Sequence, residues 1–119
     1  MHQIRLRKPW HSRWDSESLE NRLALCSRKF HLPTNVDSSQ SIVLQIRLIQ
    51  SELLDISLNG NNLPFSASDD VHVAIPVKDQ LAAFNELVLT LKPHDSAGGP
   101  LQASPVFEEL AEVSLQIAE

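Results

Sequence analysis

The sequence predicts an all-β fold, an antiparallel β-sandwich of the jelly-roll type formed by one domain over residues 1–119. Three observations support this prediction. Several short segments alternate apolar and polar residues with a period of two, which is the side-chain period of a half-buried strand. Turn-forming residues separate these segments. The chain has no long amphipathic helical pattern. About seven short strands at this spacing are typical of a sandwich or jelly roll.

The first third of the chain is expected to hold two strands joined by a loop. Residues 4–7 alternate, with Ile4 and Leu6 on one face, and Pro9 follows them. Charged residues and a nearby proline are tolerated at a sheet edge, so we expect a short edge strand there. Residues 10–21 are polar and are expected to form a loop. Residues 23–32 are expected to form a second strand, and residues 33–39 a turn.

The middle of the chain predicts four strands, each with a row of apolar side chains facing the core. Asn59-Gly60 predicts a tight turn because both residues accept positive φ, and Pro76 is expected to end the third strand. Residues 81–84 are expected to form one helical turn or a tight loop. The four predicted rows are Ile42, Leu44, Ile46 and Leu48; Leu54, Ile56 and Leu58; Val71, Val73 and Ile75; and Leu87, Leu89 and Leu91.

The C-terminal segment, residues 107–118, can be interpreted in two ways. Its apolar residues alternate, which indicates a strand, whereas Leu110 and a cluster of glutamates would suit the start of a helix. β-branched Val113 and Ile117 favour a strand over residues 111–117.

Composition restricts the classes of function. Of the 119 residues, 42% are apolar, and a chain of this length buries roughly two thirds of its unfolded surface, so a core can form without disulfides or metal. The net charge of −5 argues against nucleic-acid binding. The charge is uneven: residues 1–31 hold seven basic and three acidic side chains, a balance of +4, which leaves −9 for the rest. We expect these charges to pair within the fold; a basic patch for an acidic partner is the alternative.

The sequence gives no sign of export or membrane insertion. No run of 18 apolar residues occurs, and no apolar segment follows the charged N-terminus, so neither a membrane partner nor a secretory signal is expected. The lone Cys26 has no second cysteine for an internal disulfide, which fits a reducing compartment. We therefore expect a cytoplasmic protein.

One stretch of the chain resembles a known family. Arg28-Lys29-Phe30-His31-Leu32-Pro33 precedes the alternating residues 42–48, then come Ile56-Ser57-Leu58-Asn59-Gly60 and, later, Asn85-Glu86-Leu87-Val88-Leu89. This order resembles the galactose-binding-like jelly roll found as the sugar-binding domain of β-galactosidase and β-glucuronidase-type glycoside hydrolases. The resemblance covers roughly residues 28–91.

The departures from the family pattern also matter. Ala83 stands where the family has a turn glycine, and Asn61-Asn62 extends the hairpin. The family's catalytic carboxylates belong to a separate barrel domain that this sequence does not contain. The resemblance therefore implies a fold and a binding role, and it does not imply hydrolysis.

The candidate binding residues are Trp10, His11, Arg13 and Trp14. Aromatic rings stack on the C–H faces of sugars, while His and Arg donate hydrogen bonds to hydroxyl groups. These residues lie in a stretch expected to be a loop, where binding residues are often displayed. The alternative is that one or both tryptophans close the end of the sandwich as part of the core.

Catalytic and metal sites are not expected. The histidines lack zinc-site spacing, and Asp69-Asp70 before His72 is interpreted as a solvated loop rather than a calcium site. Glu108 and Glu109 are sequence neighbours that would point to opposite faces of a strand, and Cys26 and His31 would do the same. We therefore expect no catalytic residue, no metal, no cofactor and no enzyme activity.

Two functions remain open. The first is a non-catalytic binding module with carbohydrate as its ligand. The second is a structural or protein–protein interaction domain with no small-molecule ligand, for which an apolar outer surface would be needed. Val43, Ile49, Val88 and Leu110 are apolar positions on expected outward faces and favour the second function. The exposure of Trp10 and Trp14 distinguishes the two.

Overall fold

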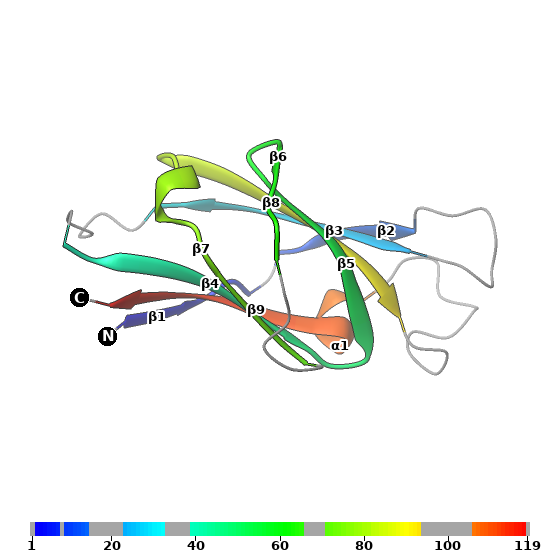
Figure 1. Cartoon of the computed structure of the whole chain (residues 1–119). Coiled ribbons are helices and arrows are strands. Elements are labelled where there is room, and N and C mark those ends of the chain that lie inside the picture. Colours follow the sequence, from blue (N-terminus) through cyan, green and yellow to red (C-terminus); the bar gives the residue numbers. More distant parts are fainter. Residues whose placement is uncertain are drawn as a thin grey trace.

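A computed structural model of the chain describes residues 2–7, 9–14, 23–32, 39–65, 71–93 and 106–118. Two antiparallel sheets pack face to face (Figure 1), so the predicted β-sandwich is confirmed. The first sheet has the order β1-β9-β4-β7 and the second has the order β2-β3-β8-β5-β6. The strands are β1 (His2–Arg5), β2 (His11–Trp14), β3 (Ala24–His31), β4 (Ser41–Leu48), β5 (Ser51–Leu58), β6 (Asn61–Asn62), β7 (His72–Pro76), β8 (Phe84–Pro93) and β9 (Ala111–Ala118).

The first sheet joins the two ends of the described chain. β1 pairs with β9 antiparallel, with Gln3 opposite Gln116 and Arg5 opposite Ser114. The predicted edge position of the first strand is therefore correct. β9 also pairs with β4 over its whole length, from Ser41 opposite Ala118 to Leu48 opposite Ala111. As a result, segments more than 60 residues apart in the sequence form one continuous surface.

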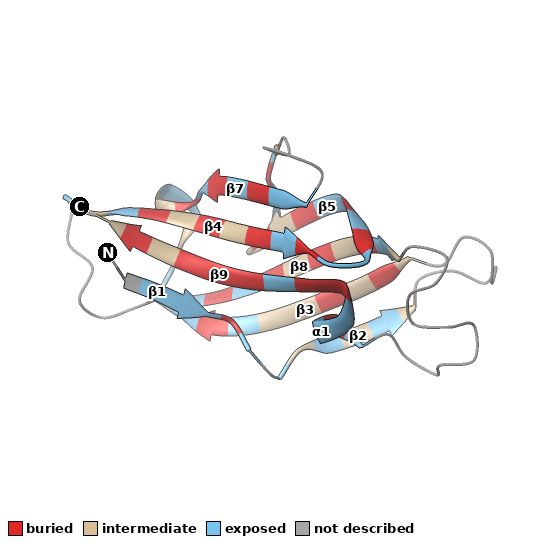
Figure 2. Ribbon diagram, turned by 90° about the horizontal axis from the view of Figure 1, so that it is seen from below, coloured by how far each residue is buried: buried red, intermediate tan, exposed pale blue. Residues whose placement is uncertain are grey.

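The core follows the period-two pattern. The rows on β4 and β8 are buried along their full length, with Ile42, Leu44 and Ile46 each 1% exposed. Figure 2 shows the resulting alternation of buried and less buried residues along the strands. β9 contributes its own buried row, and the preference for a strand over residues 111–117 is confirmed. One turn of helix, α1 (Phe107–Leu110), precedes β9.

Two of the predicted inward residues are exposed instead. Leu54 is 41% exposed because the register of β5 against β8 shifts between Leu53 and Asp55. A β-bulge adds one residue to a strand, so side chains beyond it exchange faces, and Leu53 is buried in place of Leu54. Val71 is also 41% exposed. It lies just before β7, where its carbonyl oxygen accepts a hydrogen bond from the Leu48 N–H.

The predicted Asn59-Gly60 turn is confirmed. Asn59 has φ of 54° and Gly60 has φ of 83°, the two positive values of a type I′ hairpin turn. Among the described residues no other position has positive φ, so Ala83 does not need the glycine of the family pattern. The turn between β7 and β8 is instead closed by Asn85, whose side-chain amide bonds both the N–H and the C=O of Ala82 at 2.8 Å.

One connecting segment differs from the sequence prediction. Residues 10–21 were expected to form a loop, but His11–Trp14 is strand β2, paired antiparallel with β3. The tight loop that was one of the two expectations for residues 81–84 is present, closed by Asn85, and it follows a 3-10 helix, η1 (Lys78–Gln80). Asp69 and Asp70, which were interpreted as part of a solvated loop rather than a calcium site, lie outside the described residues. None of the described helices has the length and apolar character needed to cross a membrane.

Candidate binding groove

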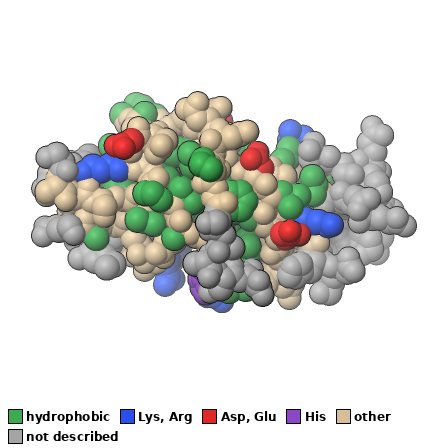
Figure 3. All heavy atoms as spheres, viewed as in Figure 1, with side chains coloured by type: hydrophobic (Ala, Val, Ile, Leu, Met, Phe, Trp, Pro, Cys, Tyr) green, Lys and Arg blue, Asp and Glu red, His purple; other side chains and the backbone are tan. Residues whose placement is uncertain are grey.

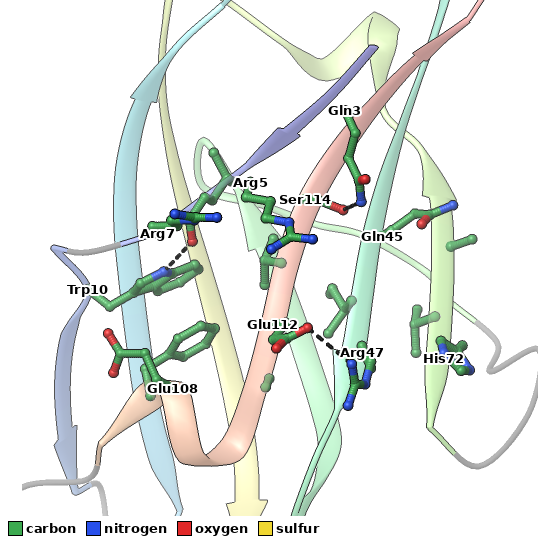
Figure 4. Close-up of a pocket in the computed structure, with 17 residues that line it drawn as sticks. Gln3, Arg5, Arg7, Trp10, Gln45, Arg47, His72, Glu108, Glu112 and Ser114 are labelled. Atoms are coloured by element: carbon green, nitrogen blue, oxygen red, sulfur yellow. Dashed lines mark hydrogen bonds and ion pairs between the residues drawn. The ribbon is translucent and has the colours of Figure 1, made fainter. Parts of the chain in front are cut away.

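A groove of 840 Å³ lies over the outer face of the sheet β1-β9-β4-β7 (Figure 4). All four strands contribute outward-facing side chains to it, because alternate residues of each strand point away from the core. Trp10, Phe107 and Glu108 form one end of the groove. The groove therefore combines a polar sheet surface with an aromatic wall.

The register of the sheet sorts the polar side chains into cross-strand rows. Arg5 lies opposite Ser114, Ser114 opposite Gln45, and Gln45 opposite Ala74. A second row runs from Glu112 through Arg47 to His72. Directly opposed residues of antiparallel strands have Cβ atoms roughly 4.5–5.5 Å apart. Apart from Ala74, the side chains of the two rows are hydrogen-bonding groups, and Ser114 among them is buried at 8% exposure.

Several of these groups already contact one another. Gln3 Nε2 donates a hydrogen bond to Ser114 Oγ at 3.2 Å. Arg47 Nη1 lies 3.4 Å from Glu112 Oε2, and both side chains are more than half exposed. Exposed ion pairs of this kind contribute little to stability because solvent screens them, so this pair adds little to the stability of the fold.

The aromatic end of the groove is held in place by two contacts. The Trp10 indole N–H donates to the Leu6 carbonyl oxygen at 2.8 Å. Its ring stacks on Phe107, with ring centroids 3.8 Å apart and an interplanar angle of 12°. Trp10 follows the first sheet's edge strand and Phe107 lies in α1, so their stacking joins the two ends of the described chain. Trp10 is a fixed, half-buried wall.

The four residues predicted as a binding cluster do not gather on one surface. Along β2 the side chains alternate, so His11 and Arg13 are exposed while Trp14 is half-buried. Trp10 and Trp14 pack against the core. His11 and Arg13 point to the outer face of the five-stranded sheet, opposite Ser27 and Leu25 of β3. Of the four, Trp10 alone lines the groove.

The polar residues of the groove were missed at the sequence level. Gln45 and Arg47 alternate with the predicted inward row of the same strand, which marks them as outward positions, and Glu112 lies in the glutamate-rich C-terminal segment. Nothing in the local sequence says that β1, β9, β4 and β7 are neighbours in that order. The available signal was polar residues at every second position of two different strands, which marks an exposed face without locating its partner strands.

Cys26 is a buried core residue. It has no exposed surface and lies opposite Ser12 of β2. Burial in apolar surroundings raises the pKa of the Cys26 thiol, because desolvation disfavours the thiolate. His31 is exposed near the end of the same strand. The two residues face opposite sides of the sheet, as strand alternation predicts, and do not form a nucleophile–base pair.

Comparisons with known proteins concern the fold. No family model matches the sequence, and no curated protein matches it. A similar solved structure is that of an FMN-binding β-glucuronidase from Facaelibacterium prausnitzii L2-6, with a TM-score of 0.64 and 12% sequence identity. The match covers 96% of this chain and 22% of that chain, so the chain spans about a fifth of the enzyme's length. At this identity the likeness shows a shared fold, a β-sandwich also found within a glycoside hydrolase.

Proposed function

We propose that the chain is a non-catalytic carbohydrate-binding module of the galactose-binding-like jelly-roll type, and that the groove is its ligand site. The observation that supports this most is the arrangement of polar side chains in cross-strand rows within an 840 Å³ groove. This volume falls in the range of roughly 300–1,000 Å³ that is usual for small-ligand sites. The fold shared with a β-glucuronidase agrees with a role in carbohydrate binding.

The chemistry of the groove suits a ligand rich in hydroxyl groups. A hydroxyl both donates and accepts, so it needs donors and acceptors close together. The Gln45 amide supplies both, and the Glu112 carboxylate accepts. The Ser114 hydroxyl, which is buried and already accepts from Gln3, adds a donor at the floor of the groove. Trp10 adds an aromatic wall at one end, where the apolar face of a sugar ring would pack.

The proposal is tested by a substitution that fills the groove without disturbing the core. Ala74 is exposed and lies in the same cross-strand row as Gln45 and Ser114. Ala74→Trp should reduce glycan affinity at least tenfold while leaving thermal unfolding unchanged. The matched control is Ala83→Trp, at an exposed position outside the groove, which should bind normally.

Binding is measured on a glycan array and then by titration calorimetry. Loss of binding in Ala74→Trp alone supports the groove as the site. Equal binding by the wild type and both variants would place the ligand elsewhere, and absence of binding to every glycan would contradict the proposed function.

The proposal includes the absence of catalysis. Two carboxylates line the groove, and that of Glu112 is ion-paired with Arg47. Glycoside hydrolysis needs two carboxyl groups placed on either side of the scissile bond, one acting as acid. Because the Glu112 carboxylate is held by Arg47, we expect no turnover of aryl glycosides. Turnover by the purified protein that disappears in Glu108→Gln or Glu112→Gln would contradict this.

A protein-interaction role is the second candidate, and one observation favours it. Phe84 is 73% exposed at the start of β8, with its ring edge-on to His31 at a centroid distance of 4.7 Å. The outward apolar positions inferred from the sequence give less support. Leu110 is buried, which corrects that inference, whereas Ile49 is 37% exposed, as inferred. Val43 and Val88 are half-buried and belong to different sheets.

Figure 3 shows hydrophobic side chains interspersed with polar and backbone atoms on the face it displays. A docking role centred on Phe84 predicts that Phe84→Ser weakens binding to a partner chain while Ala74→Trp leaves it intact. The carbohydrate proposal predicts the reverse pattern for glycan binding, so the same two variants distinguish the candidates.

A further inference from the structure

We propose that the groove binds an acidic saccharide, one whose sugar units carry a carboxylate, and that Arg5 and Arg7 bind that carboxylate. This inference rests on the proposed carbohydrate-binding function and names the class of its ligand. It comes from the charge, pairing and placement of the arginines in the groove.

The groove is positively charged in an acidic protein. Three arginines line it, Arg5, Arg7 and Arg47, together with the two glutamates Glu108 and Glu112. Three positive and two negative charges leave +1 in the groove, whereas the whole chain carries −5. An anionic ligand is therefore favoured at this groove over a surface with the average charge of the chain, because local fields guide charged ligands.

The arginines differ in whether they are already paired. Arg47 contacts the Glu112 carboxylate at 3.4 Å. Arg5 and Arg7 are both exposed, and within the described part of the chain no carboxylate pairs with either guanidinium. The positive charge available to a ligand is thus concentrated at the β1 side of the groove.

The backbone holds these two arginines on the same side. Between them, Leu6 is buried and its N–H donates to the Val113 carbonyl oxygen at 2.9 Å, which extends the pairing with β9 beyond the end of β1. Residues two apart on such an extended segment project to the same face. Figure 4 shows both side chains at the groove, Arg7 near Trp10 and Arg5 near Ser114.

Guanidinium groups in this position suit a carboxylate. The planar guanidinium matches the two carboxylate oxygens with parallel hydrogen bonds, and such charge-assisted bonds are stronger than neutral ones. Ser114 and Gln45 continue the row from Arg5 across the sheet. A sugar with its carboxylate on Arg5 and Arg7 would place its ring hydroxyls over these neutral groups. The two glutamates disfavour a ligand with many phosphates, such as nucleic acid.

The test compares oligosaccharides that differ in charge alone. Oligomers of glucuronate, galacturonate and mannuronate are titrated by calorimetry beside their methyl esters, which keep the sugar backbone and lose the negative charge. We expect at least one acid form to bind at least tenfold more tightly than its ester, and its affinity to fall with added salt. A sulfated neutral oligosaccharide is the third probe.

Single substitutions then test whether Arg5 and Arg7 are the residues that bind the carboxylate. Arg5→Gln and Arg7→Gln should each weaken binding of the acid form by about tenfold, the usual effect of losing a charge-assisted hydrogen bond, and leave ester binding unchanged. The matched control is Arg13→Gln, which removes the same charge from the outer face of the other sheet and should not change either affinity.

The failures of the two proposals are distinguishable. Equal affinity for acid and ester, equal weakening by Arg13→Gln, or tighter binding of the sulfated probe would overturn the carboxylate inference and leave the binding module standing. Absence of binding to acid, ester and neutral saccharides alike would overturn the proposed function and this inference with it.

Discussion

Asn85 should be one of the most important polar residues for stability. It is 4% exposed, yet its amide makes three hydrogen bonds. Oδ1 accepts from the Ala82 N–H at 2.8 Å and from Asn59 Nδ2 at 2.9 Å, while Nδ2 donates to the Ala82 carbonyl oxygen at 2.8 Å. One side chain therefore closes the turn before β8 and ties it to the turn after β5.

Replacing Asn85 by alanine removes all three bonds. At about 1 kcal/mol for each bond, we expect Asn85→Ala to lower the free energy of unfolding by about 2–3 kcal/mol. The groups left behind belong to Ala82, which is exposed, and Asn59, which is half-exposed. Water can reach them, so the larger cost of leaving a polar group buried without a partner is not added.

Urea denaturation followed by circular dichroism measures the effect. For a slope of about 1.5–2 kcal/mol per molar urea, a loss of this size lowers the midpoint by about 1–2 M. The matched control is Asn61→Ala, the same substitution at an exposed residue two positions after Asn59, which should change stability by less than about 0.5 kcal/mol.

A double-mutant cycle tests the connection between the turns. Asn59→Gly removes the side chain while keeping the positive φ that the turn requires. If Asn59 and Asn85 act through their 2.9 Å contact, the combined loss should differ from the sum of the single losses by about 0.5 kcal/mol or more. Strict additivity, or a midpoint for Asn85→Ala equal to that of Asn61→Ala, would refute the proposed role of this network.

Three further predictions concern the core, the hairpin turn and the thiol. Leu89 is fully buried, so Leu89→Ala should lower the free energy of unfolding by about 2–5 kcal/mol, and an unchanged urea midpoint would contradict the assignment of its row to the core. Gly60 has φ of 83° with open space around it, so Gly60→Ala should cost about 1 kcal/mol through backbone strain alone, whereas Gly60→Asn, which tolerates that φ, should cost less. Cys26 should react with a thiol reagent only after unfolding, because it is buried. Burial also raises the pKa of the Cys26 thiol in the folded state. The contribution of the neutral thiol to stability is therefore complete below the ordinary thiol pKa and is lost as pH rises through the pKa of the folded state. The free energy of unfolding of the wild type should fall more steeply at alkaline pH than that of Cys26→Ala.

Local sequence is enough to predict which residues face the core along most of the strands. The period of two is a property of the pleated backbone, so the buried faces of β4, β8 and β9 could be predicted from local sequence. The turn at Asn59-Gly60 could also be predicted from local sequence, since Asn and Gly adopt positive φ more readily than other residues. Local rules failed at Leu54, because a bulge in the pairing with β8 moved it to the outer face.

The order of the strands in each sheet, and therefore the set of side chains that share a surface, depends on the tertiary structure. Pairing partners depend on packing between segments that are far apart in the chain, and no local pattern encodes them. Trp10, His11, Arg13 and Trp14 formed a cluster in the sequence, but pairing of β2 with β3 placed His11 and Arg13 on one face and Trp14 on the other, while Trp10 precedes β2 and lines the groove. Conversely, Arg5, Ser114 and Gln45 are distant in the sequence and become neighbours because β9 lies between β1 and β4. The groove exists because long-range pairing placed these polar positions side by side.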